Sequence, residues 1–454
     1  MLYLVHPKRM VLITTTILVM LGLILYILIL EESVSQVFLY VIGVILFFFI
    51  WLRKFYILAV SFSLVAININ LVGVDPGDIL IPILLIIGSL LGYLKINELR
   101  FSQPLWIFFS VFVFFYIVSI ISGSYVTSFI VHLVSNIAFL CFLKLYVDSE
   151  QRMKQVILAI LIGVVLTSVL AVGIAFDYVP SNDKFFDVVR DFRYMSLMGD
   201  PNILAIHTMF TTLWLLDELL VPKLLKAPRW ITGTLLTFAL AQLVLTQSRS
   251  GWLGMMVALF CYGLWDLGGG HVKKALTAGG LIVAALSIIT MLFFITGFED
   301  ILLSRLDSLV SHNSQAEEDR FGLFFTKMAI DLAFDYPLGV GPGMTSSAMG
   351  LDSASGNLIG AHNSYIQILS DHGWGAFFAF FAMLMVIGKA FISKMTFDGV
   401  RYGVSYQFLF SGLAGLATCG MFHDLIVWQT AWIIPTLVTI VLWPAKNVSS
   451  NISG

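Results

Sequence analysis

Long apolar runs separated by short polar segments follow one another from residue 10 to residue 443, and they constrain this chain more than any other feature. A hydrocarbon core about 30 Å thick requires roughly 17–25 apolar residues per helix, so the runs predict about 14 transmembrane helices. Only 11% of the residues are charged and 59% are hydrophobic, which is more apolar material than a water-soluble core could absorb. We therefore expect an all-α polytopic membrane protein.

The expected helices differ mainly in length. The eighth is the shortest and could be tilted less than the others, broken or partly interfacial. The spans lie near residues 10–30, 36–51, 55–73, 79–94, 104–122, 126–147, 155–176, 203–217, 230–247, 251–267, 275–297, 373–392, 405–421 and 426–443.

The positive charges are distributed unevenly between the two sets of connecting loops. Eighteen of the 25 Lys and Arg residues fall on one side of the predicted topology. Short cytoplasmic loops carry an excess of Lys and Arg, so this side is expected to face the cytoplasm and to hold both chain termini. The other seven residues lie in three loops on the outer side: Lys184, Arg190, Arg193, Arg249, Arg305, Arg320 and Lys327.

Those three outer loops stand apart from the otherwise tight connections on that side. They cover residues 177–202, the short turn 247–250 and residues 298–362, and long structured loops are where function usually resides. They divide the chain into four regions: N-terminal transmembrane helices (1–176), transmembrane helices with outer Arg motifs (177–297), an outer loop with short helices (298–362) and C-terminal transmembrane helices (363–454).

The longest outer loop carries its own structural signals. Asp300–His312 and Glu318–Asp335 have helical apolar spacing with interspersed charges, which predicts two helices lying at the outer interface. The glycine- and proline-rich tract Pro337–Gly343 ends any helix and predicts a turn.

Four polar clusters occur in the outer segments, and each has a structural alternative. Arg193 lies shortly before an Asp-Pro-Asn sequence that could simply open a helix, and Arg249 could snorkel beside an interfacial Trp. Arg320 precedes the second interfacial helix. His362 begins the fourth cluster, and an isolated histidine at a membrane interface is more often a structural hydrogen-bonding group than a catalyst. The four clusters together are more specific than any one of them.

The order and spacing of these clusters resemble the O-antigen ligase and polymerase family of bacterial envelope glycosyltransferases. The resemblance rests on RYMSLMGDPN from Arg193, TQSRSGW around Arg249, RFGLFFTKMAIDLAFDYPLGVGPG from Arg320 and AHNSYIQILSDHGWG around His362. It covers about residues 190–445. Ligases of the family usually have fewer spans than are predicted here, which favours a polymerase.

The resemblance implies a multi-helix transmembrane glycosyltransferase of the bacterial inner membrane, with a large periplasmic loop before the histidine. It implies a glycan donor on undecaprenyl diphosphate and transfer at the periplasmic face without a metal or other cofactor. The acceptor would be another glycan or lipid A-core. Arg193, Arg249 and Arg320 match family residues that bind the donor diphosphate, and His362 matches the catalytic histidine. Further expected partners are membrane lipids, a chain-length regulator and a flippase, but no nucleic acid.

The chemistry of these residue types agrees with such roles. A diphosphate leaving group gains negative charge as the sugar C1–O bond breaks, and planar guanidinium groups can bind its oxygens bidentately. Imidazole, with an unperturbed pKa of about 6.5, can accept the proton of an attacking hydroxyl. Direct displacement would invert the anomeric centre. Asn363, Tyr365 and His423 are candidates for supporting roles, although His423 could equally serve as a cap.

Two other functions stay open at this point. Acidic residues of the outer side could hold a divalent metal, although solvated turns are the more common reason for acidic residues there. They are Asp75, Asp78, Asp183, Asp187, Asp191 and Asp200. A small-anion transporter would place ionisable groups near the bilayer midplane, where the sequence offers mainly His132 and His207. The clustering of charge outside the spans favours an enzyme.

Overall fold

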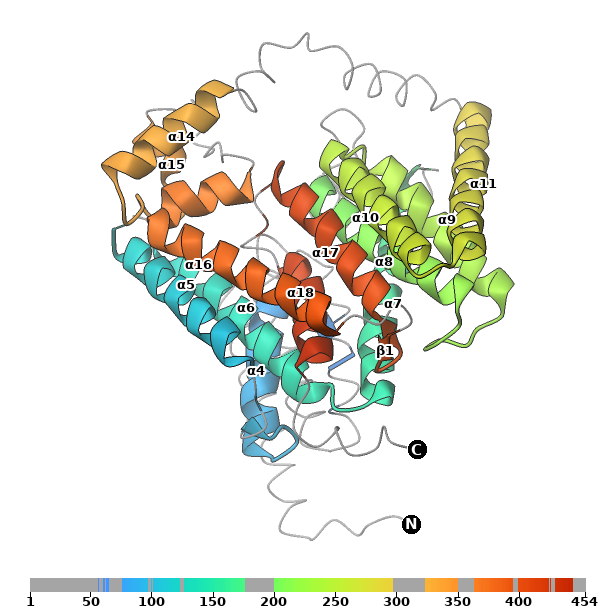
Figure 1. Ribbon diagram of the computed structural model, residues 1–454, viewed down its shortest axis with the longest axis horizontal. Helices are drawn as coiled ribbons and strands as arrows, with labels where there is room; N and C mark the ends of the chain where they lie inside the picture. The colour runs from blue at the N-terminus through green and yellow to red at the C-terminus, as the bar shows by residue number, and fades with distance from the viewer. Residues whose placement is uncertain are drawn as a thin grey trace, which may run out of the picture.

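The protein is a helical bundle, shown in Figure 1 as a computed structural model. The structure describes residues 56, 60–61, 63–64, 76–96, 99, 101–122, 126–175, 200–296, 323–349, 363–394, 399–423, 425 and 429–443. The first two expected spans, most of the third and the predicted interfacial helix Asp300–His312 lie outside these residues.

Helices account for nearly all of the described chain, and their bounds follow. They are α4 (Pro76–Leu90), α5 (Gln103–Ser122), α6 (Val126–Tyr146), α7 (Glu150–Ala175), α8 (Pro201–Leu220), α9 (Arg229–Leu245), α10 (Arg249–Gly268), α11 (Val272–Thr296), α14 (Leu323–Asp335), α15 (Thr345–Ala348), α16 (Ser364–Lys394), α17 (Tyr406–Gly420) and α18 (Gln429–Leu442). Two short strands, β1 (Val400–Arg401) and β2 (Val404–Ser405), form a hairpin between α16 and α17.

Each predicted span from the fourth onward coincides with a helix, which confirms a helical membrane protein. Within the described chain, four helices are long and apolar enough to cross a membrane: Gln103–Ile120, Pro201–Leu220, Arg249–Gly268 and Ser364–Ser393. The total of about 14 spans stays a prediction. The hairpin departs from the all-α expectation. Its turn uses Tyr402 and Gly403 at φ 54° and 75°, the positive values that a two-residue hairpin turn needs.

Helix α8 is the centre of the bundle, and the expectation that the eighth span is short is wrong. It runs for 20 residues, and 89% of its most apolar 18-residue stretch is buried, against 28% for the spanning part of α5. The helix continues through Asp217 and Glu218 because both carboxylates are hydrogen-bonded. Asp217 accepts from Lys223, Tyr262 and Ser405, and Glu218 accepts from four successive backbone N–H groups of the following loop. Paired in this way, buried acids do not terminate a helix.

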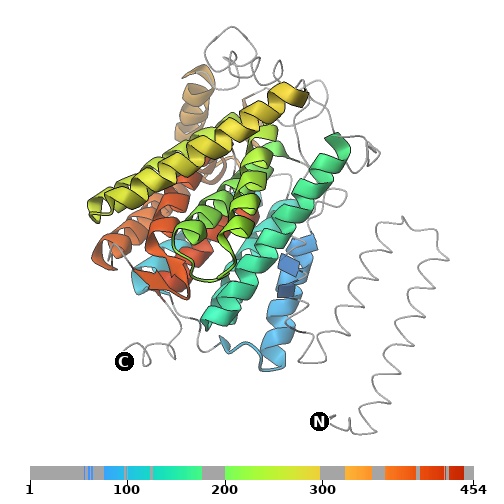
Figure 2. The same ribbon diagram turned by 90° about the vertical axis from the view of Figure 1, so that its right-hand side faces the viewer.

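Helices α10 and α17 cross α8 at close range because small residues line their contact. A Cβ added at Gly254 would lie 2.3 Å from Cys419 Sγ and 2.9 Å from the Gly415 carbonyl oxygen. A Cβ added at Gly251 would lie 2.4 Å from Ala205 Cβ of α8. Close backbone approach of this kind is how helices associate in a bilayer, where no hydrophobic effect drives them together. Next to these three helices, α7 and α11 lie on either side of α9 (Figure 2).

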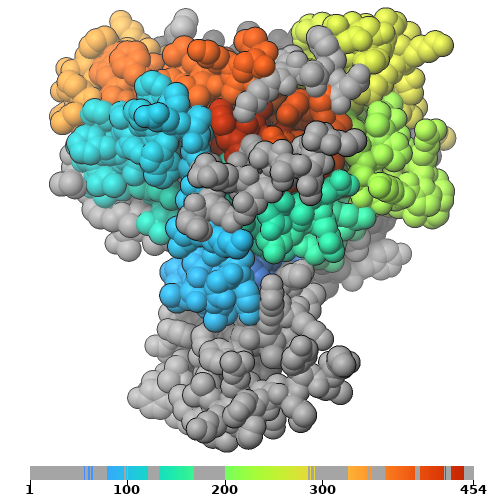
Figure 3. Space-filling model, turned by 60° about the horizontal axis from the view of Figure 1, so that its bottom comes forward, coloured from blue at the N-terminus to red at the C-terminus, as the bar shows by residue number. Residues whose placement is uncertain are grey.

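Helix α16 is bent at Gly373, where φ is 78° and ψ is 179°. Its longer second part lies along α5, with Gly375 directly against the Phe115 ring. Figure 3 shows α5 and α16 next to each other on one side of the molecule and α9 to α11 on the opposite side. The bend turns the short first part, Ser364–His372, toward the end of α17 (Figure 1). The twelfth predicted span was expected to begin at residue 373, so this first part was not assigned to it.

Candidate active site

Helices α8 and α10 begin next to each other at one end of the bundle. The Asp200 carboxylate caps α8 by accepting hydrogen bonds from the N–H groups of Asn202 (2.6 Å) and Ile203 (3.3 Å). Ser248 caps α10 by accepting from the Gly251 N–H (3.2 Å), and its hydroxyl donates to the Asn202 side-chain oxygen (2.8 Å). The first of the four sequence clusters therefore meets the second through their capping residues.

Helix α16 begins beside the segment that follows α17. The Asn363 side-chain oxygen caps α16 by accepting from two backbone N–H groups, at 3.0 and 3.2 Å. The Ser364 hydroxyl donates to the backbone oxygen of His423 (2.6 Å) and accepts from the N–H of Leu425 (2.9 Å). The fourth cluster is thereby joined to the loop that carries His423.

The end of α17 connects this helix start to α10. Tyr365 donates its hydroxyl hydrogen to the Ala417 carbonyl oxygen at 2.8 Å, and Cys419 Sγ donates to the Ser250 carbonyl oxygen at 3.3 Å. Three helix starts and one helix end thus meet in one place.

His423 and Asp200 face each other where these elements converge. His423 is 8% exposed, and its Nε2 lies 3.8 Å from Asp200 Oδ2. Asp200 uses its other oxygen to cap α8. His423, a candidate for a supporting role, therefore lies beside an acidic side chain.

Positive partial charges gather at this end of the bundle, beside the Asp200 carboxylate that caps α8. Helices α8, α10 and α16 all present their N-terminal ends here, and a helix N-terminus carries a partial positive charge. Arg249, the first residue of α10, adds a guanidinium at the same end. Backbone N–H groups at helix starts together with arginine are a common means of binding phosphate groups.

The structure brings together only part of the site predicted from the sequence. Arg249, Asn363, Tyr365 and His423 are described and converge as above. Arg193, Arg320 and His362 lie outside the described residues. His362 directly precedes the Asn363 cap, and Arg320 lies three residues before α14 begins. Among the described residues, no group of three His, Cys, Asp or Glu side chains is placed to hold a metal ion.

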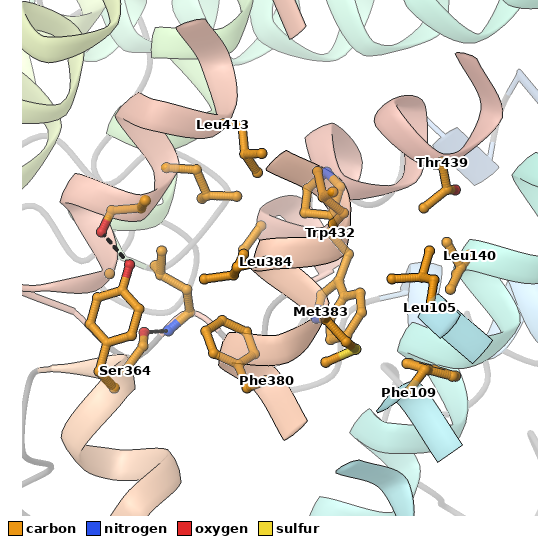
Figure 4. Close-up of a pocket in the computed structure, with 18 of the residues that line it drawn as sticks. Leu105, Phe109, Leu140, Ser364, Phe380, Met383, Leu384, Leu413, Trp432 and Thr439 are labelled. Atoms are coloured by element: carbon orange, nitrogen blue, oxygen red, sulfur yellow. Dashed lines mark hydrogen bonds between the residues drawn. The ribbon is translucent and has the colours of Figure 1, made fainter. Parts of the chain in front are cut away.

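An apolar pocket of about 150 Å³ extends from this site into the bundle between α5, α6, α16, α17 and α18. Ser364 and Tyr365 line it at the site end, and Leu105, Leu140 and Thr439 line its opposite end (Figure 4). Nearly all of its surface is hydrocarbon, from leucine, phenylalanine, methionine and tryptophan side chains. Such a pocket suits an apolar chain whose polar end stays at the site.

Residues 234–381 match the sequence model of a family described as O-Antigen ligase. This stretch of the chain is similar to the O-antigen ligase domain of that family. The match confirms the family resemblance seen in the sequence motifs, over a shorter region than the motifs suggested. This domain begins within α9, ends within α16 and includes Arg249, Arg320 and His362, whereas Arg193 and His423 lie outside it. No curated protein gives a significant match to the chain.

Sequence reasoning missed the Asp200–His423 pair and the apolar pocket that adjoins the O-antigen ligase domain. The sequence singled out Asp200 only as one of several outer acidic residues, and its contact with a residue more than 200 positions later had no sequence signal. The pocket is built by five helices, so no single stretch of sequence could reveal it.

Proposed function

We propose that the protein is a glycosyltransferase that moves an undecaprenyl-diphosphate-linked oligosaccharide onto an acceptor hydroxyl at the periplasmic face of the bacterial inner membrane. The O-antigen ligase domain at residues 234–381 carries the proposal. The convergence of Arg249 with three helix starts supports it, because a donor diphosphate needs positive potential where it binds. Both chain termini would lie in the cytoplasm, as the Lys and Arg distribution predicts.

In the proposed reaction, the acceptor hydroxyl attacks the sugar C1 and gives its proton to His362. The C1–O bond to the diphosphate breaks, and the electron pair leaves with undecaprenyl diphosphate, whose charge Arg193, Arg249 and Arg320 stabilise. Attack from the face opposite the leaving group inverts the anomeric centre. The scheme needs no metal ion or cofactor. Asn363, which caps α16 directly after His362, and His423 would hold the surroundings of the base.

We favour a polymerase, whose acceptor is another lipid-linked repeat unit of an O-antigen, capsule or exopolysaccharide. The number of predicted spans supports this preference. A ligase would instead transfer the glycan to lipid A-core. A chain-length regulator and a flippase are proposed partners for either activity.

Purified protein in lipid nanodiscs, supplied with undecaprenyl-diphosphate-linked repeat unit, tests the function. Wild type should produce a ladder of carrier-linked products and release undecaprenyl diphosphate. His362→Ala should lower the rate by about 10²–10⁴-fold, the usual contribution of a general base. Arg320→Ala and Arg249→Ala should also be strongly impaired, and Arg249→Lys should restore only part of the rate because lysine cannot bind bidentately. Arg229→Ala, at the exposed start of α9, is the matched control for Arg249→Ala.

Different outcomes assign different functions. Release of undecaprenyl diphosphate only after lipid A-core is added would identify a ligase. If wild type releases none with any acceptor, while a control enzyme consumes the same donor, glycosyl transfer is the wrong function and small-anion transport becomes the function to test.

The apolar pocket supports the proposal because a polyprenyl chain attached to the diphosphate must enter the bilayer next to the reacting atoms. Leu384 lies inside the pocket, whereas the neighbouring Met385 is 69% exposed on the outside of the same helix. Leu384→Trp should fill the pocket and raise the KM for the lipid-linked donor by about 5- to 150-fold, since overfilling an apolar site is unfavourable by about 1–3 kcal/mol. Met385→Trp should leave KM unchanged. Equal KM values for the two variants would show that the pocket does not receive the donor lipid.

A further inference from the structure

The Asp371 carboxylate joins two parts of the chain that the sequence separates. It lies near the end of the first part of α16 and is 2% exposed. Its Oδ2 accepts hydrogen bonds from the Gly343 N–H (2.9 Å) and from the Gln367 side chain, and its Oδ1 accepts from the Thr345 hydroxyl. Asp371 therefore binds the last residue of the predicted glycine-rich turn and the segment that follows it.

Backbone contacts reinforce this junction. The N–H groups of Val340 and Gly341 donate to the carbonyl oxygens of Ser370 and Asp371, both at 3.0 Å. Gly339 has a φ of 87°, and a Cβ there would lie 2.2 Å from the Asp371 carbonyl oxygen. The turn and α16 thus meet backbone against backbone, a contact that only glycine allows.

Helix α14 belongs to the same unit. The Trp374 indole N–H donates to the Ala333 carbonyl oxygen (3.1 Å), and the Trp374 ring packs on Phe334 with centroids 5.2 Å apart. In Figure 1, α14 and the first part of α16 meet at this junction, and both begin on the side that faces α17. The junction therefore fixes the directions in which the two helix starts project.

The first part of α16 is held at both of its ends. Ser364 and Tyr365 hold its beginning to the end of α17 and to the loop with His423, and Asp371 holds its other end to the turn. We propose that Asp371 is a positioning residue, which sets where the start of α16 at Asn363 stands relative to α8 and α10. It acts through neighbouring residues and does not touch substrate. The inference rests on the proposed function, because turnover is its consequence.

Asp371→Ala removes the three side-chain hydrogen bonds to Gly343, Thr345 and Gln367. We expect kcat for glycan transfer to fall by about 10- to 100-fold, because a displacement of about 1 Å can cost 10²-fold in rate, while KM for the lipid-linked donor changes by less than about twofold. Thr345→Val removes the hydroxyl that bonds to Asp371 and to the Ser370 hydroxyl, with little change of shape. It should therefore lower kcat in the same way, and Thr345→Ser should restore it. Asp331→Ala, an exposed carboxylate on α14, is the control.

Hydrogen exchange gives a second readout that does not depend on turnover. The amides of residues 340–343 should exchange faster in Asp371→Ala and Thr345→Val, while those of α8 and α10 should not change. If the turn exchanges faster but kcat stays within twofold of wild type, Asp371 is only structural and the inference is wrong. If Asp371→Ala does not fold, Thr345→Val and Thr345→Ser are compared instead. A kcat of Thr345→Val within twofold of wild type, with faster exchange in the turn, then shows that the inference is wrong. A wild-type protein without transfer activity would overturn the proposed function, and this inference with it.

Discussion

Gly373→Ala should prevent most of the protein from folding, with little monodisperse protein recovered from membranes. The native φ of 78° and ψ of 179° lie in a region that is essentially restricted to glycine, and a residue with a Cβ loses about 1–3 kcal/mol there. The added Cβ would also lie 2.2 Å from the Pro337 carbonyl oxygen and 2.8 Å from the Gly339 nitrogen. Because both neighbours are backbone atoms, no side-chain rotation can relieve the contact.

Gly388→Ala on the same helix is the matched control. Gly388 has a helical backbone, and a Cβ there meets no atom within 4 Å. This substitution should be neutral or should stabilise the helix by about 0.5–1 kcal/mol, since alanine loses less conformational freedom than glycine. Size-exclusion profiles and thermal melting in one detergent compare the two variants. Equal recovery and equal Tm values would show that the bend at Gly373 does not hold the fold together.

The sequence predicted the helical segments well because hydrocarbon thickness sets their length. The structural alternative for the Asp-Pro-Asn sequence, that it opens a helix, is confirmed by α8, which begins two residues before the predicted span. The tract Pro337–Gly343 correctly indicated a turn. The far end of α8 was missed because Asp217 reads as a charge that ends an apolar run. Its burial depends on Tyr262 and Ser405, which come 45 and 188 positions later.

Helix α16 shows a similar limit. Gly373 suggested the start of a span, although the helix already begins at Ser364 and bends at the glycine. The bend is stabilised by Pro337 and Asp371 together, and sequence spacing cannot show that these segments meet. The motifs contain the candidate site residues. The Asp371 junction and the Asp200–His423 contact arise only when segments distant in the sequence pack together.

The contact between α10 and α17 gives the second large effect. Gly254→Val should abolish glycan transfer and lower the Tm strongly, because Cys419 Sγ and the Gly415 carbonyl oxygen leave no room for even a Cβ. The two helices would have to separate, which would pull Ser250 away from Cys419 and move Arg249 relative to the start of α16. Small-to-large changes in a packed contact typically cost about 1–3 kcal/mol, and here the fixed backbone allows little relaxation.

Gly263→Val on the same helix is the control for this change. A Cβ at Gly263 meets no atom within 4 Å, so this variant has the same altered helix propensity without the packing conflict and should keep its activity.

A double variant separates the two sources of strain. Gly254→Ala alone should be less stable than wild type, and adding Cys419→Ala should recover part of the loss, because it removes the sulfur but leaves the Gly415 carbonyl oxygen in place. No recovery in the double variant would place the strain entirely in the backbone. A Gly254→Val protein as stable and active as Gly263→Val would show that α10 and α17 do not need this close approach to form the site.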